Sequence, residues 1–150
     1  MKPLLSPLVL KDFAVTENRF TILPISKEGN DFDELFDEYS IDIDFDYSKN
    51  DLFYAIVVQV KINNSEDSPQ LGGYSIMVEG TSLFEFNQTD EITNEDKASL
   101  LNYSGLSITI NYIRGFIATL TSFAPFGRYN LPTIDVNDLL SQKRDMKKEK

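Results

Sequence analysis

The segment that most constrains this chain is a predicted helix that is apolar on two of its faces. Between residues 106 and 120, apolar side chains recur at spacings of three and four, the pattern of one helical face: Leu106, Ile110, Ile113, Ile117 and Leu120. A surface helix needs one apolar stripe, whereas a helix with two must be covered twice. We expect the second face to contact another copy of the chain; it carries Ile108, Tyr112, Phe116 and Thr119. Burial of both faces within a single chain is the alternative.

The residues after this helix form an aromatic loop. Phe123, Phe126 and Tyr129 are interrupted by Pro125 and Gly127, which end the helix. Several aromatic side chains in one loop are costly if they all face water. They therefore either fold back onto the core or form a contact surface.

Alternation of apolar and polar residues predicts four strands before the helix, over residues 8–15, 39–47, 52–62 and 74–86. The second is the clearest, because its apolar residues alternate with serine and aspartate throughout. Gly80, inside the fourth segment, predicts a β-bulge.

The remaining segments are predicted to be a crossover loop and further helices. Residues 23–39 contain a turn at Gly29–Asn30 and form the loop, with a short helical turn or none. A short helix around 98–101 is expected to break at Ser104–Gly105, and a final helix begins at Asp135. Strands followed by helices are typical of an α+β fold, here a four-stranded antiparallel sheet followed by a long helix and a shorter C-terminal helix.

Composition narrows the function. The 150 residues suffice for one core, which we place in residues 1–142, followed by a flexible basic tail at 143–150. Lacking Cys and His, the chain has no thiol nucleophile, no Cys/His zinc site and no histidine base, and we predict no catalytic residues, metal or cofactor. The net charge of −10 argues against a nucleic-acid partner. We see no signal peptide and no apolar run of the roughly 18 residues that a membrane span needs, so a cytoplasmic location is expected.

Three aspartates on the second predicted strand invite a functional interpretation. Asp42, Asp44 and Asp46 resemble the start of a calcium loop, but alternate side chains on a strand stand about 6.6 Å apart. One ion with bonds of about 2.4 Å does not easily collect all three. Either they form a solvated strand face, or they join Asp12 and Glu79 in an acidic docking face for a basic partner.

The order of elements and several local strings resemble the SecB family of protein-export chaperones, from about Pro7 to Leu140. In the strands, the strings are Leu10-Lys11-Asp12-Phe13, Ile41-Asp42-Ile43-Asp44-Phe45, and Val78-Glu79-Gly80 with Leu83-Phe84. In the C-terminal part, which matches without gaps from Ser107, they are Tyr112-Ile113-Arg114, Ser122, Phe126, Asn130 and Leu131.

This resemblance implies a protomer whose long helices pack between sheets in a dimer of dimers. It also implies an ATP-independent holdase that binds unfolded or partly folded polypeptides in apolar grooves, in protein export and translocation. By family position, the client-binding residues would be Leu23, Ile25, Phe32, Leu35, Phe36, Phe123, Phe126, Tyr129, Leu131 and Ile134. Family members dock the SecA translocase motor partly through acids on the sheet. Asp12 matches one of these acids, whereas Thr16 and Met77 stand at two others, and the basic tail does not resemble the family's tail.

Other functions stay open beside this one. Divergent relatives of the family guard particular clients such as antitoxins. A monomeric protein that binds a small apolar ligand would need more strands and a helix with a single apolar face. An enzyme would need a catalytic arrangement that we do not find in these residues.

Overall fold

The computed structural model describes residues 1–25, 32–87 and 91–148. Its elements, in chain order, are β1 (Leu8–Leu23), α1 (Phe32–Asp37), β2 (Ile41–Lys49), β3 (Tyr54–Ile62), β4 (Gly73–Phe86), α2 (Asn94–Leu100), η1 (Leu101–Gly105), α3 (Leu106–Thr121) and α4 (Val136–Lys148). The turn predicted at Gly29–Asn30 lies outside the described residues.

The four strands form one antiparallel sheet in the order β1-β4-β3-β2, as expected for the α+β class. Strand β1 is longer than the predicted 8–15 segment because it continues to Leu23 along the whole of β4. The predicted bulge is on the other strand of this pair. Register shifts at Lys11 and Thr16 interrupt β1, whereas Gly80 pairs regularly with Val15 and Val58.

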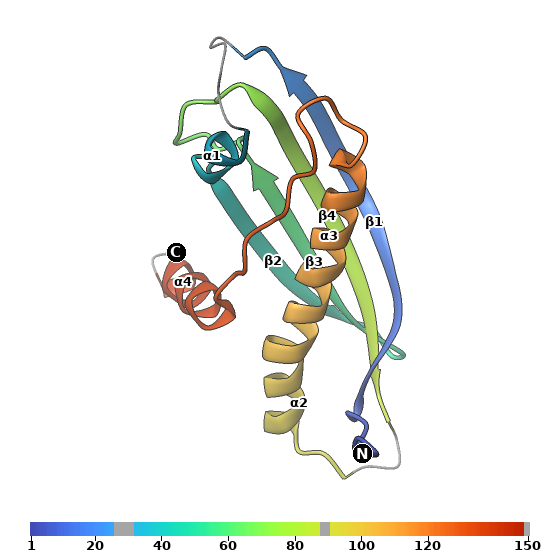
Figure 1. Ribbon diagram of the computed structural model, residues 1–150. Coiled ribbons are helices and arrows are strands. Elements are labelled where there is room, and N and C mark those ends of the chain that lie inside the picture. Colours follow the sequence, from blue (N-terminus) through green and yellow to red (C-terminus); the bar gives the residue numbers. More distant parts are fainter. Residues whose placement is uncertain (26–31, 88–90, 149–150) are drawn as a thin grey trace.

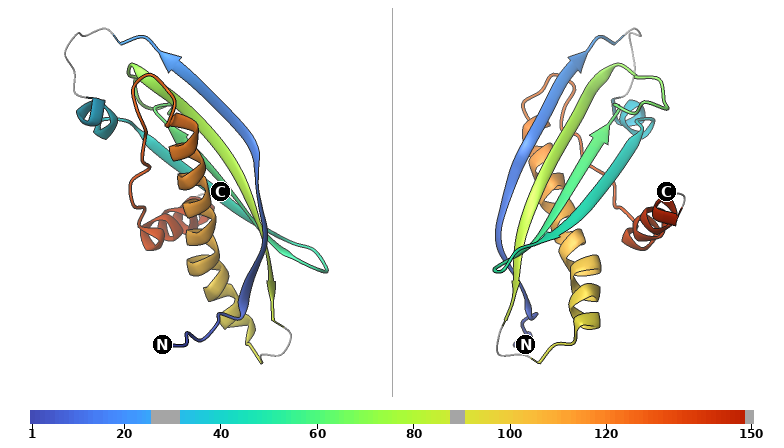
Figure 2. Two further views of the ribbon diagram at one scale, coloured as in Figure 1. Left: turned by 45° about the vertical axis from the view of Figure 1, so that its right-hand side comes forward. Right: turned by 180° about the vertical axis from the view of Figure 1, so that it is seen from behind.

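Helix α3 lies across one face of the sheet, and within the described residues the opposite face carries no helix (Figures 1 and 2). Its buried apolar residues Leu106, Ile110, Ile113 and Ile117 pack with the inward side chains of β3 and β4. This is the first of the two apolar faces predicted for the helix, and its packing on the chain's own sheet is confirmed. On this face of the sheet, β3 and β4 contribute these fully buried side chains: Ile56, Val58, Val60, Ile62, Ile76, Val78 and Phe84.

The predicted break before α3 is absent. Segment η1 is a π-helical stretch that joins α2 to α3 without an interruption of the helical path (Figure 1). Gly105 allows close packing there, because a Cβ at this position would lie 2.7 Å from Cδ1 of Ile56. The glycine brings the helix onto the sheet and does not terminate it.

The chain continues from the end of α3 along an extended segment to α4, which stands beside the β2 edge of the sheet (Figures 1 and 2). Helix α4 runs to Lys148, so residues 143–148, predicted to belong to a flexible tail, are helical. None of the residues of α4 is fully buried. Val136, Leu139 and Leu140 are partly buried against the core, and a lysine contact described below links α4 to β2.

Candidate functional site

Two segments that are far apart in the sequence meet at one end of the sheet. Helix α1 follows the crossover from β1, and the loop of residues 122–130 follows α3 (Figure 1). The ring centroids of Phe32 and Phe126 lie 5.2 Å apart, and those of Phe36 and Tyr129 lie 5.4 Å apart. The two segments expected to share a groove thus pack directly against each other.

Tyr74 on β4 is the centre of this aromatic cluster. Its ring lies 5.3 to 5.6 Å from those of Phe20, Phe36 and Phe126. Its hydroxyl donates to the carbonyl of Gly127 and accepts from the amide of Phe126, both at 2.8 Å. One side chain from the sheet therefore fixes the loop after α3. The sequence identifies Tyr74 as a core strand residue, but it contains no signal for this hydrogen-bonding role.

Exposure divides the ten residues predicted to bind clients. Phe123 is 98% exposed and Phe32 is 37% exposed. Five others are partly exposed: Leu23, Ile25, Leu35, Phe126 and Ile134. The remaining three are core residues of the protomer and do not form an open surface: Phe36, Tyr129 and Leu131. The sequence analysis missed Ile22, a half-exposed residue of β1, because it ended that strand at residue 15.

The Tyr129 hydroxyl is buried and has no hydrogen-bond partner among the described residues. Burial, with smaller contributions from Tyr39 and Asp37, raises the pKa of Tyr129 to about 12. A buried polar group without a partner costs about 1–3 kcal/mol. We therefore expect Tyr129→Phe to raise the free energy of unfolding by about 1 kcal/mol at pH 7 in urea titrations.

The raised pKa of Tyr129 predicts that the protein loses stability in alkaline solution. Because the folded-state pKa of Tyr129 lies above its unfolded value near 10, folding disfavours the phenolate. The contribution of neutral Tyr129 to the free energy of unfolding is fully present below pH 10. It is lost as the pH rises towards 12. Removing this hydroxyl should reduce that loss by about 2 kcal/mol. An unchanged alkaline slope in Tyr129→Phe would contradict the burial of this hydroxyl.

A large hollow of about 590 Å³ lies between β2 and α4. Its apolar lining includes Ile41 and Ile43 from β2 and Leu139 and Met146 from α4. Ile134, one of the predicted client-binding residues, lines this hollow. β2 is an edge strand of the sheet, and apolar side chains of β2 and α4 border its unpaired edge.

Lys143 links α4 to β2 at the border of this hollow. Its ammonium group lies 2.5 Å from Asp44 Oδ1, 3.5 Å from Asp46 Oδ1 and 5.4 Å from the centre of the Phe45 ring. Desolvation lowers the pKa of Lys143, but the hydrogen bonds and charges of Asp44 and Asp46 outweigh it and raise the pKa overall. Two of the three aspartates of the calcium-like pattern are thus partnered by a lysine.

Arg114 fastens the extended segment after the aromatic loop to α3. Its Nε donates to the carbonyl of Leu131 at 3.0 Å, and its Nη2 donates to the carbonyl of Pro132 at 2.8 Å. Asn111, one turn earlier in α3, accepts from the same guanidinium group. The arginine therefore holds the start of the segment that leads to α4 against α3.

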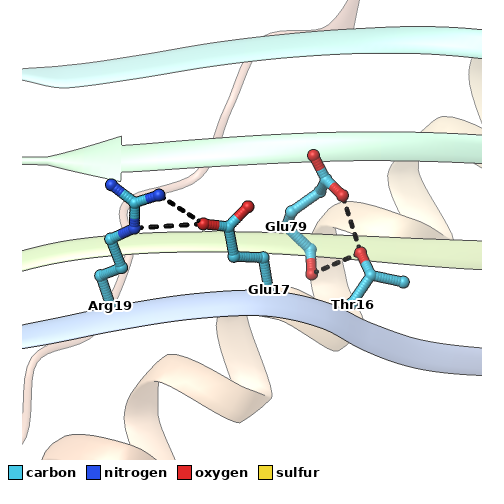
Figure 3. A network of polar contacts seen from close by, with 4 residues as sticks. All are labelled: Thr16, Glu17, Arg19 and Glu79. Atoms are coloured by element: carbon cyan, nitrogen blue, oxygen red, sulfur yellow. Dashed lines mark hydrogen bonds and ion pairs between the residues drawn. The ribbon is translucent and has the colours of Figure 1, made fainter.

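The five carboxylates predicted to form an acidic docking face all lie on the sheet face opposite α3. The strand registers place Glu79 beside Gln59 and Gln59 beside Asp44. Asp42 and Asp46 share the face of Asp44 because they are two residues away on β2, and Asp12 shares it because it pairs with Leu83 on β4. Basic and polar residues are interspersed. Arg19 Nη2 pairs with Glu17 Oε1 at 2.7 Å, and the Thr16 hydroxyl donates to Glu79 Oε1 at 2.8 Å (Figure 3). The face is therefore acidic only in patches.

The second apolar face of α3 points away from the sheet. Tyr112 is 48% exposed, although its ring stacks on Phe13 with the centroids 4.8 Å apart. Ile108 and Phe116 are partly buried, and Thr119 is exposed with its hydroxyl donating to the carbonyl of Gly115. In the protomer this face is covered only in part.

In the described part of the chain, no helix has both the length and the apolar character required to cross a bilayer.

Comparison with solved structures identifies the fold. The chain superposes on the SecB-like chaperone of Mycobacterium tuberculosis, solved in complex with a ChAD peptide from the HigA1 antitoxin. The TM-score is 0.57 at 14% sequence identity, over 85% of this chain and 91% of that chain. A protein of unknown function from Streptococcus agalactiae matches with a TM-score of 0.38 and 11% identity, over 84% of this chain and 97% of that one. No protein-family model and no curated protein matches the sequence. The fold of this chain, as its sequence pattern predicted, is that of a SecB-like chaperone.

Proposed function

We propose that this protein is an ATP-independent holdase that binds unfolded or partly folded polypeptides. The observation that carries the proposal is the meeting of α1 with the loop after α3. There a packed aromatic cluster adjoins exposed apolar residues, above all Phe123 and Phe32. Desolvation of such residues is non-directional, so a surface of this kind accepts many sequences. The SecB-like fold supports the same function.

Extended segments of clients would lie on this surface and in the hollow beside β2. The aromatic residues supply large contact areas. Tyr74 holds the loop and Arg114 holds the segment that follows it before a client arrives. A surface ordered in advance loses less entropy on binding. The antitoxin peptide in the Mycobacterium tuberculosis complex makes an antitoxin one client type to compare with export clients. A basic partner such as the SecA motor would use the carboxylates of the open sheet face.

The test is suppression of aggregation when a chemically denatured client is diluted into buffer. Phe123 is the best site for substitution because it is 98% exposed, so its removal should not disturb the fold. Since burying a phenylalanine contributes about 1.5–3 kcal/mol, Phe123→Ser should raise the concentration needed for half-protection about tenfold.

The matched control is Leu52→Ser. Leu52 is also an exposed apolar residue, at 73%, but it lies in the turn between β2 and β3, away from α1 (Figure 1). It should protect as well as the parent protein. Equal protection by Phe123→Ser and the parent would show that the aromatic surface is not where clients bind, and absence of protection by the parent would refute the holdase.

A further inference from the structure

A small cavity lies between α4, η1 and β2, on the other side of Lys143 from the large hollow. It encloses about 210 Å³. Aromatic and apolar side chains from three elements form much of its wall: Phe45, Tyr47, Tyr103 and Leu140. Tyr47 and Tyr103 are 41% and 47% exposed, so their rings are accessible from solvent.

Two cations on α4 border this cavity. Arg144 makes one long bond, from Nε to the carbonyl of Leu140 at 3.3 Å, and within the described chain it has no ion pair. Lys147 likewise has no carboxylate partner among the residues that the structure describes. Asp46, the carboxylate in the wall, faces Lys143 at 3.5 Å. The cavity thus combines aromatic surface with two positive charges that are not neutralised.

This arrangement contrasts with the chain as a whole, whose net charge is −10. Exposed charges are screened over roughly 8 Å at physiological ionic strength, so the nearest groups decide which ligand binds. A carboxylate at the rim would meet Arg144 and Lys147 first. An apolar ring beside it would lie against the tyrosines, where its face and edge find favourable contacts.

We propose that this cavity binds acidic segments of polypeptides in which an aromatic or large aliphatic side chain is flanked by carboxylates. The apolar side chain enters between Tyr47 and Tyr103, and the carboxylates pair with Arg144 and Lys147. The site is separate from the aromatic surface that carries the proposed holdase function, and it adds a preference for charge that the aromatic surface lacks.

The experiment uses the full chain and a fluorescein-labelled peptide of the sequence Gly-Asp-Phe-Glu-Leu-Asp-Gly. The comparison peptide has asparagine and glutamine in place of the three acids. Fluorescence anisotropy should show about tenfold weaker binding of the neutral peptide, because two ion pairs of up to about 1 kcal/mol each are lost. Binding of the acidic peptide should weaken with added salt.

Variants on α4 locate the binding site. The double variant Arg144→Gln/Lys147→Gln should raise the dissociation constant of the acidic peptide about tenfold. Lys148→Gln is the control, because it also removes a positive charge from α4. Lys148 pairs with Asp145 and does not line the cavity, so this variant should bind the acidic peptide as the parent does. Phe123→Ser should leave this peptide's affinity unchanged and impair only the holdase assay, which separates the two proposals.

Four results would overturn the inference. The first is equal binding of the two peptides, and the second is an unchanged dissociation constant in the double variant. The third is a lower mass of the double variant without peptide, which would show that a second copy of the chain occupies the cavity. Tighter binding of a short single-stranded DNA than of the acidic peptide would likewise assign the two cations to phosphate and not to a polypeptide.

Discussion

Gly80→Val is expected to lower the free energy of unfolding by about 3 kcal/mol, as overpacking a tight core does. Strand β4 passes directly beneath α3 and beside the Phe13 ring of β1. A Cβ at residue 80 would lie 2.8 Å from two ring carbons of Phe13 and 3.0 Å from Cγ1 of Ile113. Valine would force the helix or the phenylalanine away from the sheet. Urea unfolding followed by circular dichroism measures the loss.

Thr81→Val is the matched control for Gly80→Val. It places the same side chain one residue further along β4, on the sheet face without a helix. Its effect should stay within about 0.5 kcal/mol. If Gly80→Val unfolds at the same urea concentration as the parent, the close contact of Phe13 and Ile113 over Gly80 does not exist.

Tyr112→Asp is expected to halve the mass of the protein in solution, from that of four 17.1 kDa protomers to that of two. We propose that the outer face of α3, with Ile108, Tyr112, Phe116 and Thr119, is the contact that joins two dimers of the chain into a dimer of dimers. A carboxylate within such an apolar contact would lose its hydration without a partner, at a cost of several kcal/mol. Light scattering at micromolar concentration measures the mass.

Tyr103→Asp is the control for this change. Tyr103 and Tyr112 are exposed to nearly the same extent, 47% and 48%, but Tyr103 lies on η1 and not on the proposed contact face. The Tyr103→Asp variant should keep the parent's mass. Since Tyr112 also stacks on Phe13, circular dichroism must show that the Tyr112→Asp variant is folded. A parent protein with the mass of a single protomer would refute the assembly.

Much of the fold was predictable because its signals are local. The regular alternation through Ile41, Ile43 and Phe45 identifies β2, and the three-and-four spacing from Leu106 to Ile117 identifies α3. Strand β1 was predicted too short because its register shifts twice, at Lys11 and Thr16. Each shift reverses which residues face the helix, so a single alternation does not extend through the strand.

Glycine signals were the least reliable part of the prediction. The bulge predicted at Gly80 lies opposite it, at Thr16 of β1, and the helix break predicted at Gly105 is absent. Both glycines allow another element to approach closely. A close approach depends on what lies opposite the glycine in three dimensions. Phe13 and Ile113 lie over Gly80, and Ile56 lies over Gly105, from parts of the chain that the local sequence does not specify.

The candidate site was predicted at the level of segments and not of side chains. Helix α1 and the loop after α3 do meet, but Phe36 and Tyr129 are buried there while Phe123 is exposed. All three are aromatic residues in a polar or turn-rich context, so composition does not distinguish them. The distinction comes from Tyr74, whose two hydrogen bonds orient the loop and so determine which rings face the core.

Hydrogen exchange of the full chain, with and without a permanently unfolded client polypeptide, tests the proposed function most directly. If clients bind where α1 meets the loop after α3, exchange of the backbone amides of residues 32–37 and 122–128 should slow when the client is added. The turn between β2 and β3 should exchange as before. Client binding that leaves both of the first two segments unchanged would contradict the proposed site, and no detectable binding of any unfolded client would contradict the holdase itself.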